Sequence, residues 1–429
     1  MRTPLVVMAV LVVALLGLDA AVGDRGDAGG RAAAGAIGAT CAAEPPPAPV
    51  ATIARRVEAL RGLRYATLPV PQRVTPARAR ADGLKDFDAS EPPRRRAAEE
   101  EVLGLLGLVP PGTSLRTVAA SLFGEGVAGY YDPRTGRLKV VTGTATSTKA
   151  LTETVLAHEL THALEDQRFH LLDDQPSGAD DRALARLALV EGTATELMTR
   201  YGRRWLSPGE LLASALGSAF APTGDLPPFL QAQALFPYLS GQAFVARLLR
   251  RAGGRWALVD DAERLRPPIS TEQVMHPERY LRADGPKPVR IGAGRVLGSG
   301  WTRVRTGTWG EYQTRELLAN GGGGGSEAAA AGWGGDRWEL WRSQPLAASG
   351  CPAPCRAADV LVLRWRWDTP RDRREFAARL GVWTRSERGR LGAGLATAAG
   401  PRGVTLALAP HDALARRVAR VGQRVARGR

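Results

Sequence analysis

The chain has 429 residues, of which 44% are hydrophobic and 24% charged. This length suits two or three domains, and the composition excludes wholesale disorder, a collagen and a polytopic membrane protein. The 3 cysteines are too few for a small scaffold held together by disulfides.

The formal net charge of +15 raises the question of a nucleic-acid partner. The cations are 54 Arg and 4 Lys, and they are spread along the chain rather than gathered in one patch. We therefore expect no nucleic-acid partner. Arginines and valines interleave at residues 416–429, which predicts a basic amphipathic helix. Such a helix allows contact with a membrane or cell surface, although a solvated terminal helix is the simpler interpretation.

The N-terminus predicts export from the cytoplasm. Residues 5–18 form an apolar run after Arg2, and small residues follow it as far as Gly23. The run is short for a membrane span and typical of a signal peptide, here residues 1–23, with an uncleaved N-terminal anchor as the alternative. Either way we expect a secreted or extracytoplasmic protein. In an oxidising compartment Cys351 and Cys355 are spaced for a local disulfide, which leaves Cys41 over.

The elements follow in chain order after a Gly-, Ala- and Pro-rich linker at 24–50. Strand-like runs at 127–131 and 138–141, joined by turn residues, predict a β-hairpin. Apolar periodicity predicts helices at 51–62, 95–107, 147–170, 179–200, 208–219, 238–252 and 256–264. A further helix follows the break at residues 110–112 and ends at about residue 123.

The last third of the chain has a different character. Strands are expected at 338–341, 360–367 and 404–408, with a helix at 370–380 and a glycine loop at 321–325. The tryptophans of these strands favour a buried core over an aromatic binding face. The fold class is therefore α+β, with a mostly helical domain at 51–289 that contains the short hairpin, and a smaller α+β domain at 290–429.

One short motif carries chemistry. His158 to His162 reads His-Glu-Leu-Thr-His, an HExxH motif inside the helix predicted at 147–170. Because positions i and i+4 share one helix face, both imidazoles can bind one Zn²⁺. Glu159 then lies beside the metal as a general base for a zinc-bound water. The alternative is a pair of hydrogen-bonded core histidines.

Glu191 is the expected third ligand. It lies in the middle of the apolar stripe of the helix predicted at 179–200, where an unpaired carboxylate is costly and a metal compensates the cost. The alternative is a buried ion pair with an arginine. His170 lies two turns beyond His162, too far along the helix to bind the same ion. Three protein ligands and a water are typical of catalytic zinc.

These residues resemble the gluzincin metallopeptidases, which bind zinc through HExxH on one helix and a Glu on the next. His158 to Ala163 is similar to the corresponding run in thermolysin-like enzymes. Over about 95–380 the chain also resembles a family of exported, largely uncharacterised bacterial proteins identified as zinc metallopeptidases. The segments that carry this resemblance are 129–133, 158–167, 189–192, 270–277 and 332–336. The resemblance implies a zincin-like catalytic domain at 51–289 and hydrolysis of peptide bonds in a peptide or protein substrate.

The sequence departs from the gluzincin pattern at one position. Gluzincins often place an Asp four residues after the ligand Glu to orient a histidine, and Thr195 stands there in this chain. Glu196 and Asp166 are the candidate replacements. If neither replaces it, the alternative function is a zinc-stabilised, non-catalytic binding or chaperone-like protein outside the cytoplasm.

Peptide hydrolysis also needs a donor to the developing oxyanion. We name His276, which precedes Pro277 at an expected helix boundary, as a second catalytic candidate beside Glu159. A surface or capping histidine is its alternative, and Tyr130, Tyr131 and Tyr201 are rival donors. The hairpin at 126–142 directly precedes the motif helix, and is the candidate edge for an extended peptide substrate.

Overall fold

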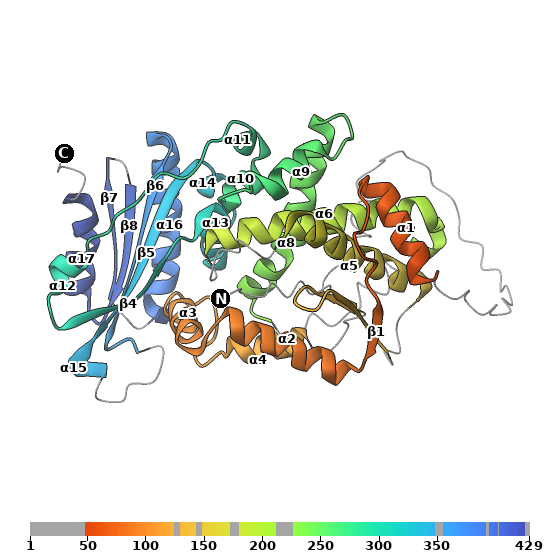
Figure 1. Ribbon diagram of the computed structural model, residues 1–429. Coiled ribbons are helices and arrows are strands. Elements are labelled where there is room, and N and C mark those ends of the chain that lie inside the picture. Colours follow the sequence, from red (N-terminus) through yellow and green to blue (C-terminus); the bar gives the residue numbers. More distant parts are fainter. Residues whose placement is uncertain are drawn as a thin grey trace, which may run out of the picture.

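The computed structural model of the protein describes residues 48–123, 129–142, 148–171, 180–211, 226–347, 355–391, 394–401 and 403–424 (Figure 1). The predicted signal peptide, most of the linker and residues 212–219 of one expected helix lie outside these ranges. Within them, no helix combines the length and the apolar character that a membrane span requires.

The fold class is α+β, as expected. The N-terminal part is mostly helical, and its elements are α1 (Val50–Arg61), β1 (Pro71–Val74), α2 (Pro76–Ser90), α3 (Pro93–Leu105), α4 (Leu115–Leu122), β2 (Gly129–Asp132), β3 (Arg137–Val141), α5 (Lys149–Phe169), α6 (Asp181–Trp205), α8 (Pro228–Arg251), α9 (Ala257–Arg264), α10 (Thr271–Met275) and α11 (Pro277–Leu281). The remaining elements are α12 (Gly294–Leu297), β4 (Trp301–Gly307), α13 (Gly310–Asn320), α14 (Ser326–Ala330), β5 (Trp333–Ser343), α15 (Gln344–Ala347), β6 (Asp359–Trp367), α16 (Pro370–Leu391), β7 (Gly394–Gly400), β8 (Gly403–Ala409) and α17 (Asp412–Arg424).

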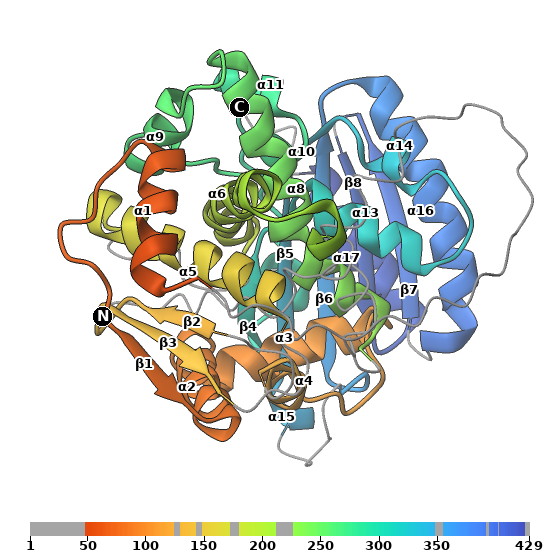
Figure 2. The same ribbon diagram turned by 90° about the vertical axis from the view of Figure 1, so that its right-hand side faces the viewer.

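A three-stranded sheet of order β1-β3-β2 lies against α5 (Figure 2). Strands β2 and β3 form the predicted hairpin, and the Asp132 carboxylate accepts the Arg134 N–H within its turn at 3.1 Å. Strand β1, which the sequence pattern does not predict, pairs with β3 in the parallel sense. Both β1 and β2 are therefore edges of this sheet.

The C-terminal part is an antiparallel sheet of order β4-β5-β6-β8-β7 with helices on both faces. The side chains of strand β6 alternate between two apolar clusters, one on each face of the sheet. Its odd residues from Leu361 to Trp367 belong to the apolar cluster with α13, α14 and α16, whereas Val360 and Val362 face α12 and α17. The tryptophans of β5 and β6 are buried except Trp341, which is partly buried, so the core interpretation is confirmed.

Helix α17 is amphipathic as predicted, and its apolar residues pack against the sheet. Arginines of its other face, such as Arg416 and Arg420, are exposed. Contact with a membrane or cell surface, if it occurs through these residues, is therefore electrostatic. Cys355, shortly before β6, is disulfide-bonded, and Cys41 and Cys351 lie outside the described residues.

Helices α6 and α8 cross at a contact between their backbones. A Cβ on Gly192 would lie 2.3 Å from the Gly241 carbonyl oxygen, and a Cβ on Gly241 would lie 2.0 Å from the Ala188 carbonyl oxygen. Real Cβ atoms do not approach so closely, so only glycine permits this crossing. Since Gly192 follows Glu191, the crossing fixes the depth at which the predicted third ligand lies.

Replacing Gly241 with alanine is expected to lower the free energy of unfolding by about 1–3 kcal/mol, because the added methyl group forces α6 and α8 apart. Urea denaturation followed by circular dichroism measures the change. Gly389→Ala in α16 is the control, because a Cβ there meets nothing within 4 Å and alanine is the better helix former. Equal midpoints for Gly241→Ala and wild type would contradict the tight crossing.

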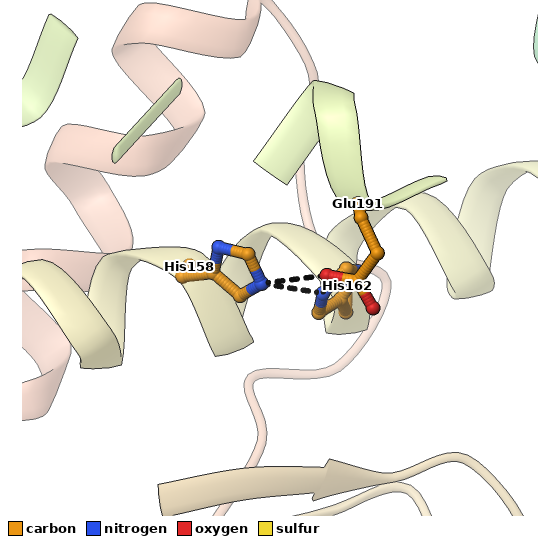
Figure 3. Close-up of side chains that lie close together, drawn as sticks. All are labelled: His158, His162 and Glu191. Atoms are coloured by element: carbon orange, nitrogen blue, oxygen red, sulfur yellow. Dashed lines mark hydrogen bonds and ion pairs between the residues drawn. The ribbon is translucent and has the colours of Figure 1, made fainter. Parts of the chain in front are cut away.

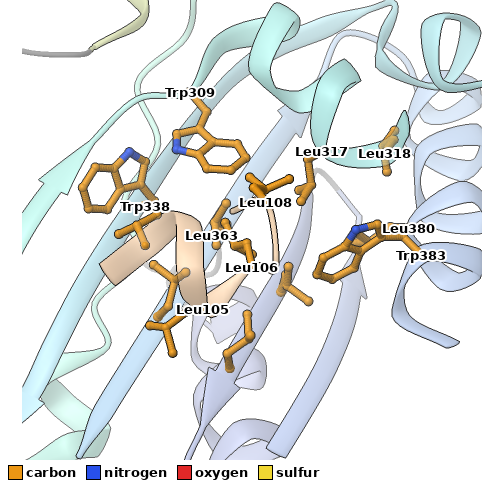
Figure 4. Packing of buried hydrophobic residues seen from close by; sticks show 14 of the residues in the cluster. Leu105, Leu106, Leu108, Trp309, Leu317, Leu318, Trp338, Leu363, Leu380 and Trp383 are labelled. Carbon is orange, nitrogen blue, oxygen red and sulfur yellow. The ribbon is translucent and has the colours of Figure 1, made fainter. Parts of the chain in front are cut away.

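Residues 98–109, in and after α3, pack on the same face of the C-terminal sheet as α13 and α16 (Figure 4). Glu99 lies in this contact, 3.6 Å from Arg305 of β4. Burial raises the pKa of Glu99 to about 7 even though Arg305 opposes the shift. The core of the sheet thus includes a titrating group from the N-terminal part.

The raised pKa of Glu99 predicts a pH dependence of stability. The pKa of Glu99 is 4.5 in the unfolded chain and about 7 in the folded protein, so the folded state binds this proton more tightly. The resulting stabilisation of the fold is complete below pH 4.5 and is lost as the pH rises through about 7. The free energy of unfolding of the metal-free wild type is therefore expected to fall by up to about 1.4 kcal/mol per pH unit in this window. Glu99→Gln is expected to remove this contribution. Denaturation midpoints from about pH 5 to about pH 8 measure it. The exposed Glu327→Gln should retain the wild-type slope, and a wild-type slope in Glu99→Gln would refute the assignment.

Candidate metal centre

The HExxH motif lies in the middle of α5, a helix of 21 residues. The Thr148 side chain caps its first turn by accepting the Leu151 N–H, and His170 ends it in the left-handed conformation with φ of 52°. His158, Glu159 and His162 are all within 2% of complete burial. Helix α6 packs against α5 and brings Glu191, which is 1% exposed, opposite the two histidines.

Three ligand atoms converge between these two helices (Figure 3). His158 Nε2 lies 2.9 Å from His162 Nε2 and 3.2 Å from Glu191 Oε2. His162 Nε2 lies 3.6 Å from the same oxygen. A tetrahedral ion with bonds of about 2.0–2.1 Å holds its ligand atoms about 3.3 Å apart, so the triangle has the size of such a site. Among the described residues this is the group of His, Cys, Asp and Glu side chains that could hold a metal ion.

The protonation states of the group also suit a cation. Burial lowers the pKa of His158 to about 4, although Glu191 opposes the shift. Burial alone would raise the pKa of Glu191, but hydrogen bonds from His158 and His162 outweigh it, and the net shift is downward. A neutral imidazole and an ionised carboxylate are the forms that bind a metal. The alternative for Glu191, an ion pair with an arginine, is not what the structure shows.

Glu159 lies beside the group and is held differently. Its Oε2 accepts the backbone N–H of Tyr131 in the edge strand β2 at 2.8 Å, and its buried Oε1 has no hydrogen-bond partner among the described residues. Burial raises the pKa of Glu159 well above its ordinary range, and the negative charge of Glu191 adds to the shift. The free oxygen and the raised pKa are properties of a carboxylate that can accept a proton.

Tyr238 of α8 is a residue of this site that no sequence motif marks. Its ring centroid lies 6.3 Å from that of His158, and its side chain is buried. Burial raises the pKa of Tyr238, and the charges of Glu191 and Glu159 raise it further, so its hydroxyl stays protonated and can donate. Its place depends on the crossing of α6 and α8, which a local pattern does not reveal.

The donors that the sequence predicted form hydrogen bonds with residues other than the three ligands. His276 is at the junction of α10 and α11, and its Nε2 is 2.8 Å from Glu311 Oε1. The hydroxyls of Tyr130, Tyr131 and Tyr201 donate to Asp82, Asp166 and Glu153 respectively. His170 is exposed at the end of α5. The catalytic role of His276 stays a prediction.

The expected replacements for the missing Asp do not orient the histidines. Within the described ranges, the buried Nδ1 atoms of His158 and His162 and the buried Thr195 Oγ1 have no hydrogen-bond partner. The Glu196 carboxylate instead accepts from Arg200 at 2.9 Å, and Asp166 accepts from Tyr131. Both carboxylates lie on α5 and α6, the helices that carry the ligands, but their side chains bind other partners.

Comparisons with known proteins leave the site unassigned. Residues 295–426, from α12 to α17, match a family described as a "domain of unknown function (DUF8575)". The chain is 20% identical to a protein from Chloroflexus aurantiacus whose crystal structure is that of "a putative hydrolase with a novel fold". The alignment covers 55% of this chain and 87% of the other, with a TM-score of 0.35, which is too low to bear on fold or function. No curated protein matches the chain.

Replacing Glu191 with glutamine is expected to remove or strongly weaken metal binding, because the amide supplies no negative charge to the ion. Metal content by mass spectrometry should give about one zinc ion per wild-type chain after dialysis and a tenfold or greater loss of affinity in Glu191→Gln. Glu196→Gln on the same helix is the control and should bind metal like wild type. Full metal retention in Glu191→Gln would exclude Glu191 as a ligand.

Proposed function

We propose that the protein is a zinc-dependent metallopeptidase of the gluzincin type that acts outside the cytoplasm on a peptide or protein substrate. The observation that carries the proposal is the buried triangle of His158, His162 and Glu191 with the Glu159 carboxylate fixed beside it. Two imidazoles and one carboxylate are a donor set typical of catalytic zinc, in which a water takes the fourth position. Bound there, zinc would act as a Lewis acid that polarises a carbonyl and lowers the pKa of a water molecule.

The chain's own residues have separate tasks in this reaction. Glu159 accepts a proton from water at Oε1, while the Tyr131 amide holds Oε2 in place. The water oxygen bonds to the carbonyl carbon, and Glu159 then returns the proton to the nitrogen that leaves as the C–N bond breaks. The raised pKa of Glu159 favours the first of these transfers, the uptake of the proton. We assign the Tyr238 hydroxyl, ahead of His276, as the donor to the substrate's carbonyl oxygen. The charges of the two neighbouring glutamates keep that hydroxyl protonated.

A zinc-stabilised, non-catalytic binding protein is the second candidate. The unpaired Nδ1 atoms and Thr195 favour it, because histidine ligands in active zinc sites usually donate their second N–H to a carboxylate or carbonyl. Both candidates bind zinc, and they differ in whether Glu159 matters to turnover.

Hydrolysis of β-casein by the zinc-loaded protein tests the peptidase. Glu159→Gln is expected to lower kcat by about 10²–10⁴-fold, because the proton acceptor is lost while all three ligands remain. Zinc content should not change, which separates the chemical step from metal binding. Glu196→Gln should retain wild-type activity. Stoichiometric zinc without any Glu159-dependent cleavage would establish the non-catalytic alternative.

A further inference from the structure

A loop between α1 and β1 is fastened to the motif helix. The Tyr65 hydroxyl donates to the Leu160 carbonyl oxygen at 2.7 Å, inside the HExxH turn. The Gln167 side chain accepts the N–H groups of Ala66 and Thr67 at 2.9 and 3.2 Å and donates to the Thr67 carbonyl oxygen at 2.8 Å. These four hydrogen bonds join positions about 100 apart in sequence and hold the loop in one place.

The fastened loop forms one wall of an open groove of about 800 Å³, called here the 66–72 groove. Its lining consists of residues 66–72, residues 135–137 of the hairpin turn, Tyr131 and Gln167. Leu68 and Val70 are 42% and 73% exposed in this wall. Large apolar side chains held in water by a rigid loop are typical of a binding surface.

The lining of the groove also includes one cation. Arg137 is exposed in the lining, and within the described part of the chain its guanidinium has no ion-pair partner. Two arginines near it are paired, Arg134 with Asp86 and Arg78 with Asp82. The 66–72 groove therefore offers an apolar surface and one positive charge.

The groove adjoins the candidate active site through two residues. Tyr131 lines the groove, and its backbone N–H holds the Glu159 carboxylate. Gln167 lies five residues beyond His162 on α5, which corresponds to about 7–8 Å along the helix. A polypeptide in the active site can therefore place a neighbouring side chain in the groove.

We propose that the 66–72 groove is a specificity subsite for an extended polypeptide substrate, and this inference rests on the proposed peptidase function. The groove receives a large aliphatic or aromatic side chain between Leu68 and Val70, and Arg137 pairs with an acidic side chain adjacent to it. Continuity with the site through Tyr131, together with the uncompensated charge of Arg137, favours a substrate over other occupants.

Peptide capture tests the subsite without requiring hydrolysis. The full chain carrying Glu159→Gln, loaded with zinc, is immobilised and exposed to a random heptapeptide library with acetylated and amidated ends. Retained peptides are sequenced by mass spectrometry. Blocked ends ensure that Arg137 meets only side-chain carboxylates. We expect enrichment of Leu, Val and Phe next to Asp or Glu.

Variants of the groove, each made in the Glu159→Gln chain, give the decisive comparison. Val70→Asp is expected to abolish the apolar enrichment, with retention of such peptides falling about tenfold or more. Arg137→Glu should invert the charge preference from acidic to basic peptides. Leu265→Asp and Arg264→Glu are the matched controls, because Leu265 is 70% exposed and both residues lie at the end of α9, away from β1 (Figure 2). They should leave the enrichment unchanged.

The remaining outcomes overturn the subsite. It fails if no peptide is retained, or if Val70→Asp, Leu68→Asp and Arg137→Glu all retain the same peptides as the parent chain. It fails equally if peptides bind only after residues 1–47 are deleted, which would assign the groove to the chain's own N-terminal segment. A change of oligomeric state in Val70→Asp, seen by light scattering, would assign it to a second copy. Casein hydrolysis by the wild type decides the peptidase function separately.

Discussion

The structure depends on how it accommodates one buried carboxylate. Glu191 is removed from water at the contact of α5 and α6, where an isolated negative charge is prohibitively costly. Two imidazoles on α5 face it, and the backbone contact of α6 with α8 fixes its depth. The histidine ligands, the glycine crossing and the packing of α8 therefore all serve to place three donor atoms around a common point.

The two glutamates of the site are given opposite properties by their surroundings. Hydrogen bonds from two imidazoles lower the pKa of Glu191, which suits an anionic ligand. Glu159 receives a single backbone N–H and feels the charge of Glu191, so its pKa is raised and it can hold a proton. A difference in environment thus separates a ligand from a base, as it does in other sites with paired carboxylates.

Sequence reasoning succeeded where the information is local. The i, i+4 spacing of His158 and His162 and the apolar stripe around Glu191 are properties of single helices, and both predictions place side chains that the structure brings together. It failed where the structure depends on distant contacts. Tyr238, the parallel pairing of β1 with β3 and the packing of residues 98–109 on the C-terminal sheet leave no periodic pattern in the sequence. Glu196 and Asp166 failed as substitutes because side-chain direction is decided by partners such as Arg200 and Tyr131.

The unpaired Nδ1 atoms show what orients the histidines in this protein. In the part of the chain that the structure describes, neither Nδ1 atom has a hydrogen-bond partner, and the ring of Tyr238 lies near that of His158 at an interplanar angle of 31°. Helix α5 is in turn held by polar contacts on several sides, since Glu165 binds Arg61 of α1 at 2.7 Å and Leu160 binds Tyr65. Rigidity of the whole helix therefore replaces the local hydrogen bond that a carboxylate behind the ring would supply. The same contacts hold the loop of the 66–72 groove, so any movement of α5 would displace the ligands and the groove together.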